Sequence, residues 1–163
     1  MTKTDKNSVP VTLLKSNKDI LSPIFSNMIN QSFKTAIFPD DLKCGILSPL
    51  LKTGDSTDRE NFRPITGIHN FSKIFERSIY NRLLKFLTDF SILSPHQFGF
   101  RKNMSTESAI ISLTEFLYEV INSKEIALNI CIDFRKAFDT VNHKILIDKF
   151  DKYGVRGPSL ALI

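Results

Sequence analysis

The 163-residue sequence has no tryptophan, only two cysteines and no long apolar run. Cys44 and Cys131 lack the Cys-x-x-Cys spacing of zinc and redox sites, so both are expected to be small core residues in a reducing compartment. No stretch comes near the roughly 18 consecutive apolar residues of a membrane span, and the polar N-terminus has no apolar signal segment. These absences predict an intracellular protein without a membrane span, and they do not distinguish cytoplasm from nucleus.

Signatures of several enzyme classes are missing as well. There is no G-x-x-x-x-G-K phosphate loop, and Lys52-Thr53-Gly54 has no Ser-x-x-Lys motif to accompany it, as penicillin-binding enzymes require. A haloacid-dehalogenase-type phosphatase needs a second aspartate two residues after the first, but Arg135 holds that position after Asp133. The three histidines have no metal-ligand spacing and are expected at the surface or hydrogen-bonded: His69, His96 and His143.

The charge of the chain is concentrated in its middle. The formal net charge is +5, and the segment from Lys43 to Lys102 holds ten Lys and Arg against five Asp and Glu, while the remainder holds twelve of each. A basic surface of this kind suits a partner with a phosphate backbone. A solvated basic face without a partner accounts for the same count, so the charge alone leaves both interpretations open.

Hydrophobic periodicity predicts an α+β fold in one domain over residues 10–163, after a loose segment over residues 1–9. Fourteen phenylalanines indicate a core rich in Phe. Helical spacing of apolar residues predicts helices over residues 20–33, 71–87, 106–121 and 146–153; Thr106 is the expected cap of the third, and Gly154 stops the fourth. Strands are predicted over residues 46–51, 63–67 and 126–132.

The first two of these strands are expected to form a hairpin with a charged tip at residues 52–61. Pro49 confines its strand to a sheet edge or a bulge, because proline cannot donate a ladder hydrogen bond. Residues 94–103 contain Pro95 and Gly99 and are expected to be irregular. Pro158 is expected to start another element shortly before Ile163, so we expect the chain to be a fragment.

The sharpest chemical feature is the segment Ile130-Cys-Ile-Asp-Phe-Arg-Lys-Ala-Phe-Asp-Thr-Val-Asn-His143. Its hydrophobic strand delivers Asp133 at the C-terminal end, where a carboxylate can serve as a ligand for Mg²⁺. Phosphoryl transfer with two metal ions needs at least two such carboxylates, so Asp133 alone is not sufficient. Capping of the strand-to-helix connection is the structural alternative for an aspartate at this position.

Asp133-Phe-Arg-Lys-Ala-Phe-Asp139 resembles motif A of non-LTR reverse transcriptases, and further motifs of that family precede it in the family's order. The resemblance covers about residues 9–157, and four ordered motifs are more specific than any one of them. The upstream motifs are Asn61-Phe-Arg-Pro-Ile65, Ser72-Lys-Ile-Phe-Glu-Arg77 and Gln97-Phe-Gly-Phe-Arg101 with Ser105-Thr106, and the lead-in segments are Phe38-Pro39 and Leu51-Lys-Thr-Gly-Asp55.

The resemblance implies a role in the reaction for three residues near motif A. Asp133 would hold the catalytic metal ions, with the backbone carbonyl of Phe134 as a second oxygen donor. Phe138 would lie beneath the sugar of the incoming nucleotide and exclude a 2′-hydroxyl. An ordinary core position is the structural alternative for Phe138. Asp139 is expected to cap the following helix instead of binding a metal.

The resemblance also implies positions that bind substrates. Lys52 and Arg63 would clamp the nucleotide triphosphate, since the planar fork of arginine donates two hydrogen bonds to phosphate. The template and primer would lie along Phe98, Gly99, Phe100 and Arg101, where aromatic and guanidinium planes can stack on bases. The alternatives are a solvated charged loop for the first pair and core side chains for Phe98 and Phe100.

The sequence departs from the family at its second catalytic motif. No Tyr-x-Asp-Asp turn follows Asp133, and the only Asp-Asp, at positions 40–41, precedes the finger motifs. We therefore expect a truncated right-hand polymerase, with fingers over about residues 10–122 and the start of a palm over about residues 123–163.

The function implied for an intact protein is RNA-directed DNA synthesis with Mg²⁺, an RNA template, a DNA primer and deoxynucleoside triphosphates. The alternative is a non-catalytic relic, or a nucleic-acid-binding module that keeps the fold. The sequence leaves the oligomeric state open.

Overall fold

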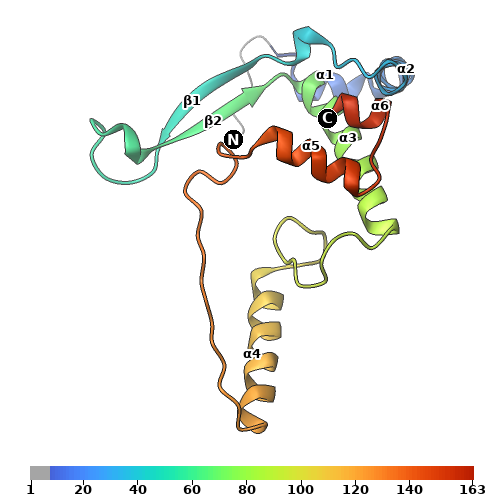
Figure 1. The fold of residues 1–163 in the computed structure, drawn as a ribbon. Coiled ribbons are helices and arrows are strands. Elements are labelled where there is room, and N and C mark those ends of the chain that lie inside the picture. Colours follow the sequence, from blue (N-terminus) through green and yellow to red (C-terminus); the bar gives the residue numbers. More distant parts are fainter. Residues whose placement is uncertain (1–7) are drawn as a thin grey trace. The chain divides into compact units, whose positions relative to one another are not determined.

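The computed structural model describes residues 8–163, so most of the loose segment predicted for residues 1–9 lies outside the described residues. The chain divides into two compact units (Figure 1). The first unit comprises residues 8–84 together with residues 144–163, and the second is Lys85–His143. The third helix along the chain, α3 (Asn70–Asp89), begins in the first unit and ends in the second.

The predicted helices of the first unit are present, with small shifts at their ends. A short helix that periodicity did not predict, α1 (Val11–Ser16), precedes α2 (Lys18–Thr35). Two 3₁₀ turns, η1 (Asp40–Leu42) and η2 (Arg59–Asn61), flank the hairpin strands along the chain. The C-terminal part adds α5 (His143–Lys152) and α6 (Pro158–Leu162), which confirms the element expected at Pro158.

The core of the first unit is small. Its buried apolar side chains are Ile29, Phe75, Val155 and Leu162, which come from α2, α3 and the C-terminal segment. Phe75 is the only buried residue of the fourteen phenylalanines, so the prediction of a Phe-rich core is wrong. The periodic apolar residues of α2 are divided between a packed side and an exposed side, because the first unit offers too few elements to cover both.

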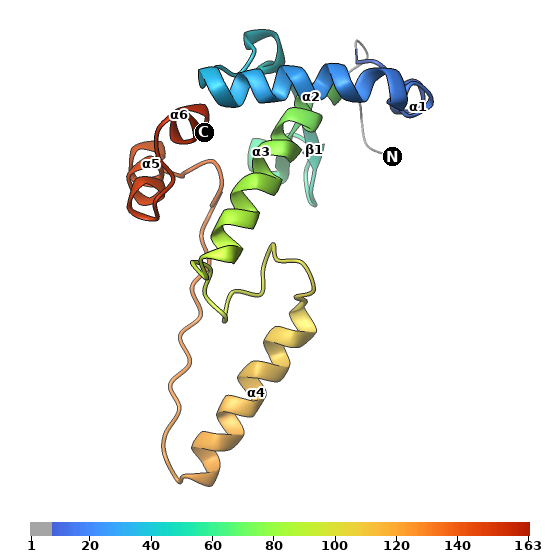
Figure 2. The same cartoon turned by 90° about the vertical axis from the view of Figure 1, so that its right-hand side faces the viewer.

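Polar contacts anchor the start of α3 within this core. The Ser72 hydroxyl is fully buried and donates to the carbonyl of Leu42, 2.8 Å away. The backbone N–H of Asn70 donates to the Ser8 hydroxyl at 2.9 Å, and its side chain donates to the carbonyl of Val9 at 2.8 Å. Ser8 and Val9 are therefore tied to α3, whereas the sequence placed both in the loose N-terminal segment. Figure 2 shows α3 starting beside α2 and leading away from it.

The predicted hairpin is confirmed. β1 (Gly45–Leu51) pairs antiparallel with β2 (Phe62–Ile68), with Leu50 opposite Arg63 and Leu51 opposite Phe62. Pro49 lies opposite Pro64. A two-stranded sheet tolerates both prolines because each of its strands is an edge strand, which is where Pro49 was expected. The strands project away from the helices of their unit (Figure 1).

The second unit contains α4 (Thr106–Asn122), which follows the irregular segment predicted over residues 94–103. The helix is confirmed, but its cap lies one residue earlier than expected. Ser105 is the N-cap and its hydroxyl accepts from the N–H of Ser108 at 3.1 Å, whereas Thr106 is the first helical residue. No residue of Lys85–His143 is buried.

The strand predicted over residues 126–132 is not formed, and the prediction is wrong. The segment has no regular secondary structure, and its alternating apolar residues are exposed, from 71% for Ile130 to 97% for Ile126. A strand needs a neighbour for its backbone hydrogen bonds, and β1 and β2 are the only paired strands among residues 8–163. The alternation is therefore present without the ladder it predicted.

Three smaller expectations also fail. Cys44 and Cys131 are exposed and not in a core, since one precedes a hairpin without a covering layer and the other lies in the unpaired segment. Asp139 does not cap α5, which begins only at His143. Instead, Lys136 has a positive φ of 50°, and its carbonyl accepts from the N–H groups of Asp139 and Thr140, which closes a turn before the helix.

The end of α5 agrees with the sequence. Gly154 follows it with a φ of 95°, a conformation that favours glycine, and its N–H donates to the carbonyl of Asp151 at 2.9 Å. None of the helices formed by residues 8–163 combines the length and the apolar character needed to cross a membrane.

Candidate functional site

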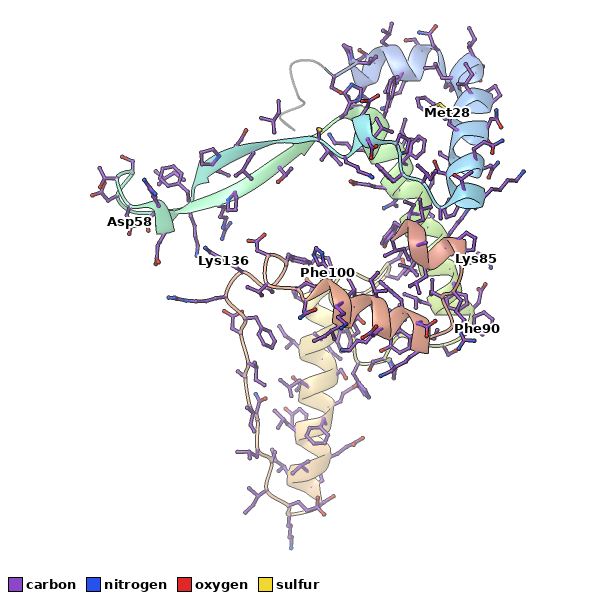
Figure 3. All side chains as sticks on the ribbon, turned by 45° about the horizontal axis from the view of Figure 1, so that its top comes forward. Met28, Asp58, Lys85, Phe90, Phe100 and Lys136 are labelled. Atoms are coloured by element: carbon purple, nitrogen blue, oxygen red, sulfur yellow. The ribbon has the colours of Figure 1, made fainter. Side chains whose placement is uncertain are left out.

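The hairpin tip, residues 52–61, is an ordered loop held by its own polar groups. The side chain of Asp55 accepts from the N–H of Thr57, and that of Asp58 from the N–H of Glu60, both at 2.9 Å. The Thr57 hydrogen bonds hold the pKa of Asp55 below its usual range. Two of the tip's carboxylates are thus engaged with backbone N–H groups of the loop itself. Asp58 marks the far end of the hairpin in Figure 3.

Lys52 and Arg63, the expected triphosphate clamp, belong to this hairpin. Both residues are exposed, and neither forms an ion pair within the described part of the chain. Arg63 lies opposite Leu50, and Lys52 follows two residues after Leu50. The N–H of Lys52 donates to the carbonyl of Asn61 at 2.7 Å, so the pairing continues to Lys52, and strand alternation then predicts one face for Lys52 and Arg63. Diagonal positions of this kind are about 7–8 Å apart, within reach of one polyphosphate.

The four expected template and primer residues lie in the irregular segment before α4. Arg101 is half-buried and donates from Nη1 to the carbonyl of Ser94 at 2.7 Å, so it braces its own loop. Its other N–H donors remain available for a ligand. Phe98 is half-buried, and the carbonyl of Gly99 accepts from the Gln97 side chain at 3.3 Å. Phe100 has a φ of 59° and is 85% exposed.

The second unit brings together two residues that the sequence separates. The rings of Phe100 and Phe138 meet edge to face, with 5.7 Å between their centroids. Phe138 is 76% exposed, so it is not the ordinary core phenylalanine of the structural alternative. Phe100 carries a positive φ, which is unusual for a bulky residue. The segments of residues 97–101 and 133–139 thus contact each other through two exposed aromatic rings.

Asp133 lies in the unpaired segment and is exposed, as is its neighbour Phe134. Among residues 8–163, no group of three or more His, Cys, Asp and Glu side chains is arranged to hold a metal ion. Since the two-metal reaction needs at least two carboxylates, Asp133 alone does not make such a centre. The predicted ligand pair of Asp133 and the Phe134 carbonyl is therefore a partial donor set.

The expected site residues are divided between the two units. Lys52 and Arg63 belong to the first unit, and the others belong to the second: Phe98, Gly99, Phe100, Arg101, Asp133, Phe134 and Phe138. The contact between Phe100 and Phe138 joins two members within one unit. The backbone pairing of the hairpin joins Lys52 and Arg63 within the other.

Sequence reasoning missed the importance of Asn61. Its side chain donates to the carbonyl of Asp55 at 2.9 Å, and its own carbonyl accepts from the N–H of Lys52 at 2.7 Å. The signal was present, because asparagine readily hydrogen-bonds the backbone of a turn. In the sequence, Asn61 stands out only as the first residue of the Asn-Phe-Arg-Pro-Ile motif.

Comparison with known families matches residues 50–162 to the reverse transcriptase (RNA-dependent DNA polymerase) family. The matched residues include the hairpin tip, the irregular segment and motif A. The chain belongs to this family, and its resemblance to the domain found in non-LTR retrotransposons is confirmed. Its mixture of helices and a sheet agrees with that assignment.

Individual relatives come from mobile elements. The chain is 36% identical over 124 residues to a probable RNA-directed DNA polymerase from transposon BS of Drosophila melanogaster, a match that covers 76% of this chain and 14% of that protein. It is 32% identical over 130 residues to the RNA-directed DNA polymerase from mobile element jockey of the same species, covering 79% and 14%. The chain thus spans about a seventh of these relatives. No solved structure matches it.

Proposed function

We propose that this chain is the finger region and the first part of the palm of an RNA-directed DNA polymerase that copies a non-LTR retrotransposon inside the cell. The observation that carries the proposal is the family match over residues 50–162, which contains every candidate site residue. The reaction joins a primer 3′-hydroxyl to the α-phosphate of a deoxynucleoside triphosphate on an RNA template and releases pyrophosphate.

We assign the substrate roles within this proposal to the residues described above. Lys52 and Arg63 bind the triphosphate from one face of the hairpin, and Phe138 lies beneath the sugar. Phe98, Gly99, Phe100 and Arg101 line the template and primer. The exposure of Lys52 and Arg63 supports the first role, and the Phe100–Phe138 contact supports a shared surface for sugar and base pair.

Asp133 and the Phe134 carbonyl are proposed as Mg²⁺ ligands in the intact polymerase. Oxygen donors suit this ion, which would neutralise charge on the reacting phosphate. A second carboxylate must come from another part of the polymerase. The test uses the longer open reading frame, obtained by sequencing onward from the Ile163 codon. There, Asp133→Asn should abolish RNA-templated incorporation, and Phe138→Ala should raise the use of ribonucleotides relative to deoxynucleotides. Unchanged activity in Asp133→Asn would refute the assignment.

The 163-residue polypeptide alone is expected not to extend a primer. It carries one carboxylate of the metal centre, and the reaction needs at least two. The measurement is incorporation of labelled deoxynucleotide on an RNA template with Mg²⁺, alongside a reverse transcriptase of known activity. Extension that depends on Mg²⁺ and disappears in Asp133→Asn would contradict this prediction.

The polypeptide is nevertheless expected to bind a primer–template duplex with strongly salt-dependent affinity. The excess of basic residues lies between Lys43 and Lys102, and phosphate binding releases condensed counterions. The slope of log K against log salt is negative, and Arg63→Ala should reduce its magnitude by about one. Lys149→Ala, in α5 outside the basic segment, is the matched control. Affinity that stays constant from low to high salt would be evidence against the counterion argument.

A non-catalytic nucleic-acid-binding module is the second candidate, and the single carboxylate favours it for the isolated polypeptide. The two functions differ in the longer reading frame. A frame that continues into a Tyr-x-Asp-Asp or related Asp-Asp turn supports the polymerase. A stop codon or frameshift, combined with salt-dependent binding, supports the module.

A further inference from the structure

We propose that Asn61 is a positioning residue that fixes the hairpin tip so that Lys52 and Arg63 face one polyphosphate ligand. The inference rests on the proposed triphosphate clamp and deepens it. Asn61 itself needs no contact with the ligand. It acts through the backbone of the loop between the two cations.

Asn61 is the hydrogen-bonding centre of the tip. Its Nδ2 donates to the carbonyl of Asp55 at 2.9 Å and so spans the loop from one side to the other. Its backbone N–H donates to the carbonyl of Asp58 at 3.2 Å, and its carbonyl accepts from the N–H of Lys52 at 2.7 Å. Three contacts therefore connect Asn61, at the end of the loop, to its beginning at Lys52 and to its middle at Asp55 and Asp58.

The Lys52 contact extends the sheet beyond its last regular pair. Leu51 pairs with Phe62, so the hydrogen bond from Lys52 to Asn61 continues the ladder by one step. This step sets the direction in which the Lys52 side chain leaves the hairpin. Without it, Lys52 would belong to a free loop and lose its fixed position relative to Arg63.

Gly54 packs against Asn61 from the opposite side of the loop. Its φ is 89°, a conformation that side chains disfavour, and a Cβ at this position would lie 3.0 Å from Asn61 Nδ2. The loop thus leaves no room for a methyl group at Gly54 unless the Asn61 amide moves. A substitution at Gly54 or at Asn61 therefore disturbs the same contact.

The acids of the tip and the two proposed clamp residues differ in their contacts. The carboxylates of Asp55 and Asp58 accept backbone N–H groups of the loop, whereas Lys52 and Arg63 remain without an ion-pair partner in the described residues. Two of the three acids of the tip are thus bound by the loop, the third, Glu60, is exposed, and Lys52 and Arg63 remain available for a ligand. An ordered tip holds these two cations on one face, which a polyphosphate requires.

The test measures binding of inorganic tripolyphosphate by the 163-residue chain, by calorimetry at low salt. Asn61→Ala and Asn61→Asp should each weaken binding about three- to tenfold, because one hydrogen bond of ordinary strength is lost from the tip. The second variant keeps the shape of the side chain but replaces the N–H donor by a carboxylate, whose charge also repels the anion, so Asn61→Ala decides the outcome. Gly54→Ala should also weaken binding, through contact of its methyl group with the same amide and through backbone strain at a φ of 89°. Ser56→Ala, in the tip but outside these hydrogen bonds, is the control and should bind normally.

Far-UV circular dichroism and the melting temperature separate positioning from general stability. Weaker binding with unchanged helix content, together with faster exchange of the Lys52 amide, supports the inference. A lowered melting temperature with normal tripolyphosphate affinity would overturn it. If Asn61→Ala does not fold, Gly54→Ala decides by the same two readouts.

The parent chain and Arg63→Ala distinguish this inference from the proposed clamp. A parent chain that does not bind tripolyphosphate refutes the clamp itself. If Arg63→Ala abolishes binding and both Asn61 variants still bind normally, only the positioning role is refuted.

Discussion

Several polar side chains of the candidate site form hydrogen bonds within their own loop. Asp55 accepts from Thr57, Asn61 spans the hairpin tip, and Arg101 braces the irregular segment through Ser94. Each of these bonds fixes a loop without the support of a buried core, since most surrounding residues are exposed. Lys52 and Arg63, which form no ion pair within the described residues, lie beside the braces of the hairpin tip in the sequence.

The acid titration of the hairpin tip follows from Asp55. The Thr57 hydrogen bonds lower its pKa in the folded tip below the ordinary value of 3.8. Its contribution to tip stability is therefore present above that value and is lost as the pH falls through the lowered pKa. The Thr57 amide resonance should titrate with a midpoint below 3.8, and Asp55→Asn should remove this transition. A midpoint at or above the ordinary value would contradict the hydrogen-bonded geometry.

At the scale of elements, the helices and strands that form are those whose backbone N–H and C=O groups are hydrogen-bonded within the helix or to the partner strand. The helices bond internally, and the hairpin strands bond each other, so α4 persists with no buried residue. Residues 126–132 have an equally clear apolar pattern but no neighbouring strand, and they remain irregular. For elements with so little packing, caps and turns carry an unusual share of the stability.

The cap of α4 gives a test at this scale. Ser105→Ala should destabilise the helix by about 0.5–1 kcal/mol, because its hydroxyl accepts from Ser108 and is the only side chain that caps the helix. Thr106→Ala is the matched control and should have little effect or a slightly stabilising one. Amide exchange in the first turn and far-UV circular dichroism measure both variants. A larger loss of helix stability in Thr106→Ala than in Ser105→Ala would show that Thr106 is the cap.

For the whole molecule, the main consequence of the two-unit organisation is exposed apolar surface. The second unit has no buried residue, and its large apolar side chains are exposed along α4 and over residues 126–132. An extended apolar segment with unpaired backbone groups is a template for pairing with other chains. We therefore expect the isolated polypeptide to associate with itself and to be poorly soluble.

Neutral substitutions in residues 126–132 test this expectation. Ile130→Ser removes one apolar side chain that is 71% exposed and should raise the soluble fraction and lower the apparent mass by light scattering. Asn129→Ser, the adjacent position of the opposite alternation, is the control and should change neither. Equal solubility of the parent chain and the Ile130 variant would show that this segment does not drive association.

The sequence by itself determined the local elements, the order of the motifs and the family. Helical periodicity over residues 20–33 and 71–87, and the apolar runs on either side of the charged tip, are short-range patterns whose backbone partners lie within the same element or hairpin. The motifs from Asn61 to Asp139 are equally local, and the family match confirms the family that they indicated.

Only the tertiary structure decided which apolar residues are covered and which side chains meet. Phe75 is buried whereas thirteen other phenylalanines are not, because only the start of α3 is enclosed by α2 and its neighbours. The alternation at residues 126–132 predicted a strand, but a ladder needs a partner that periodicity cannot supply. The Phe100–Phe138 contact and the central position of Asn61 in the hairpin tip arise from chain folding, since each joins atoms that the sequence keeps apart.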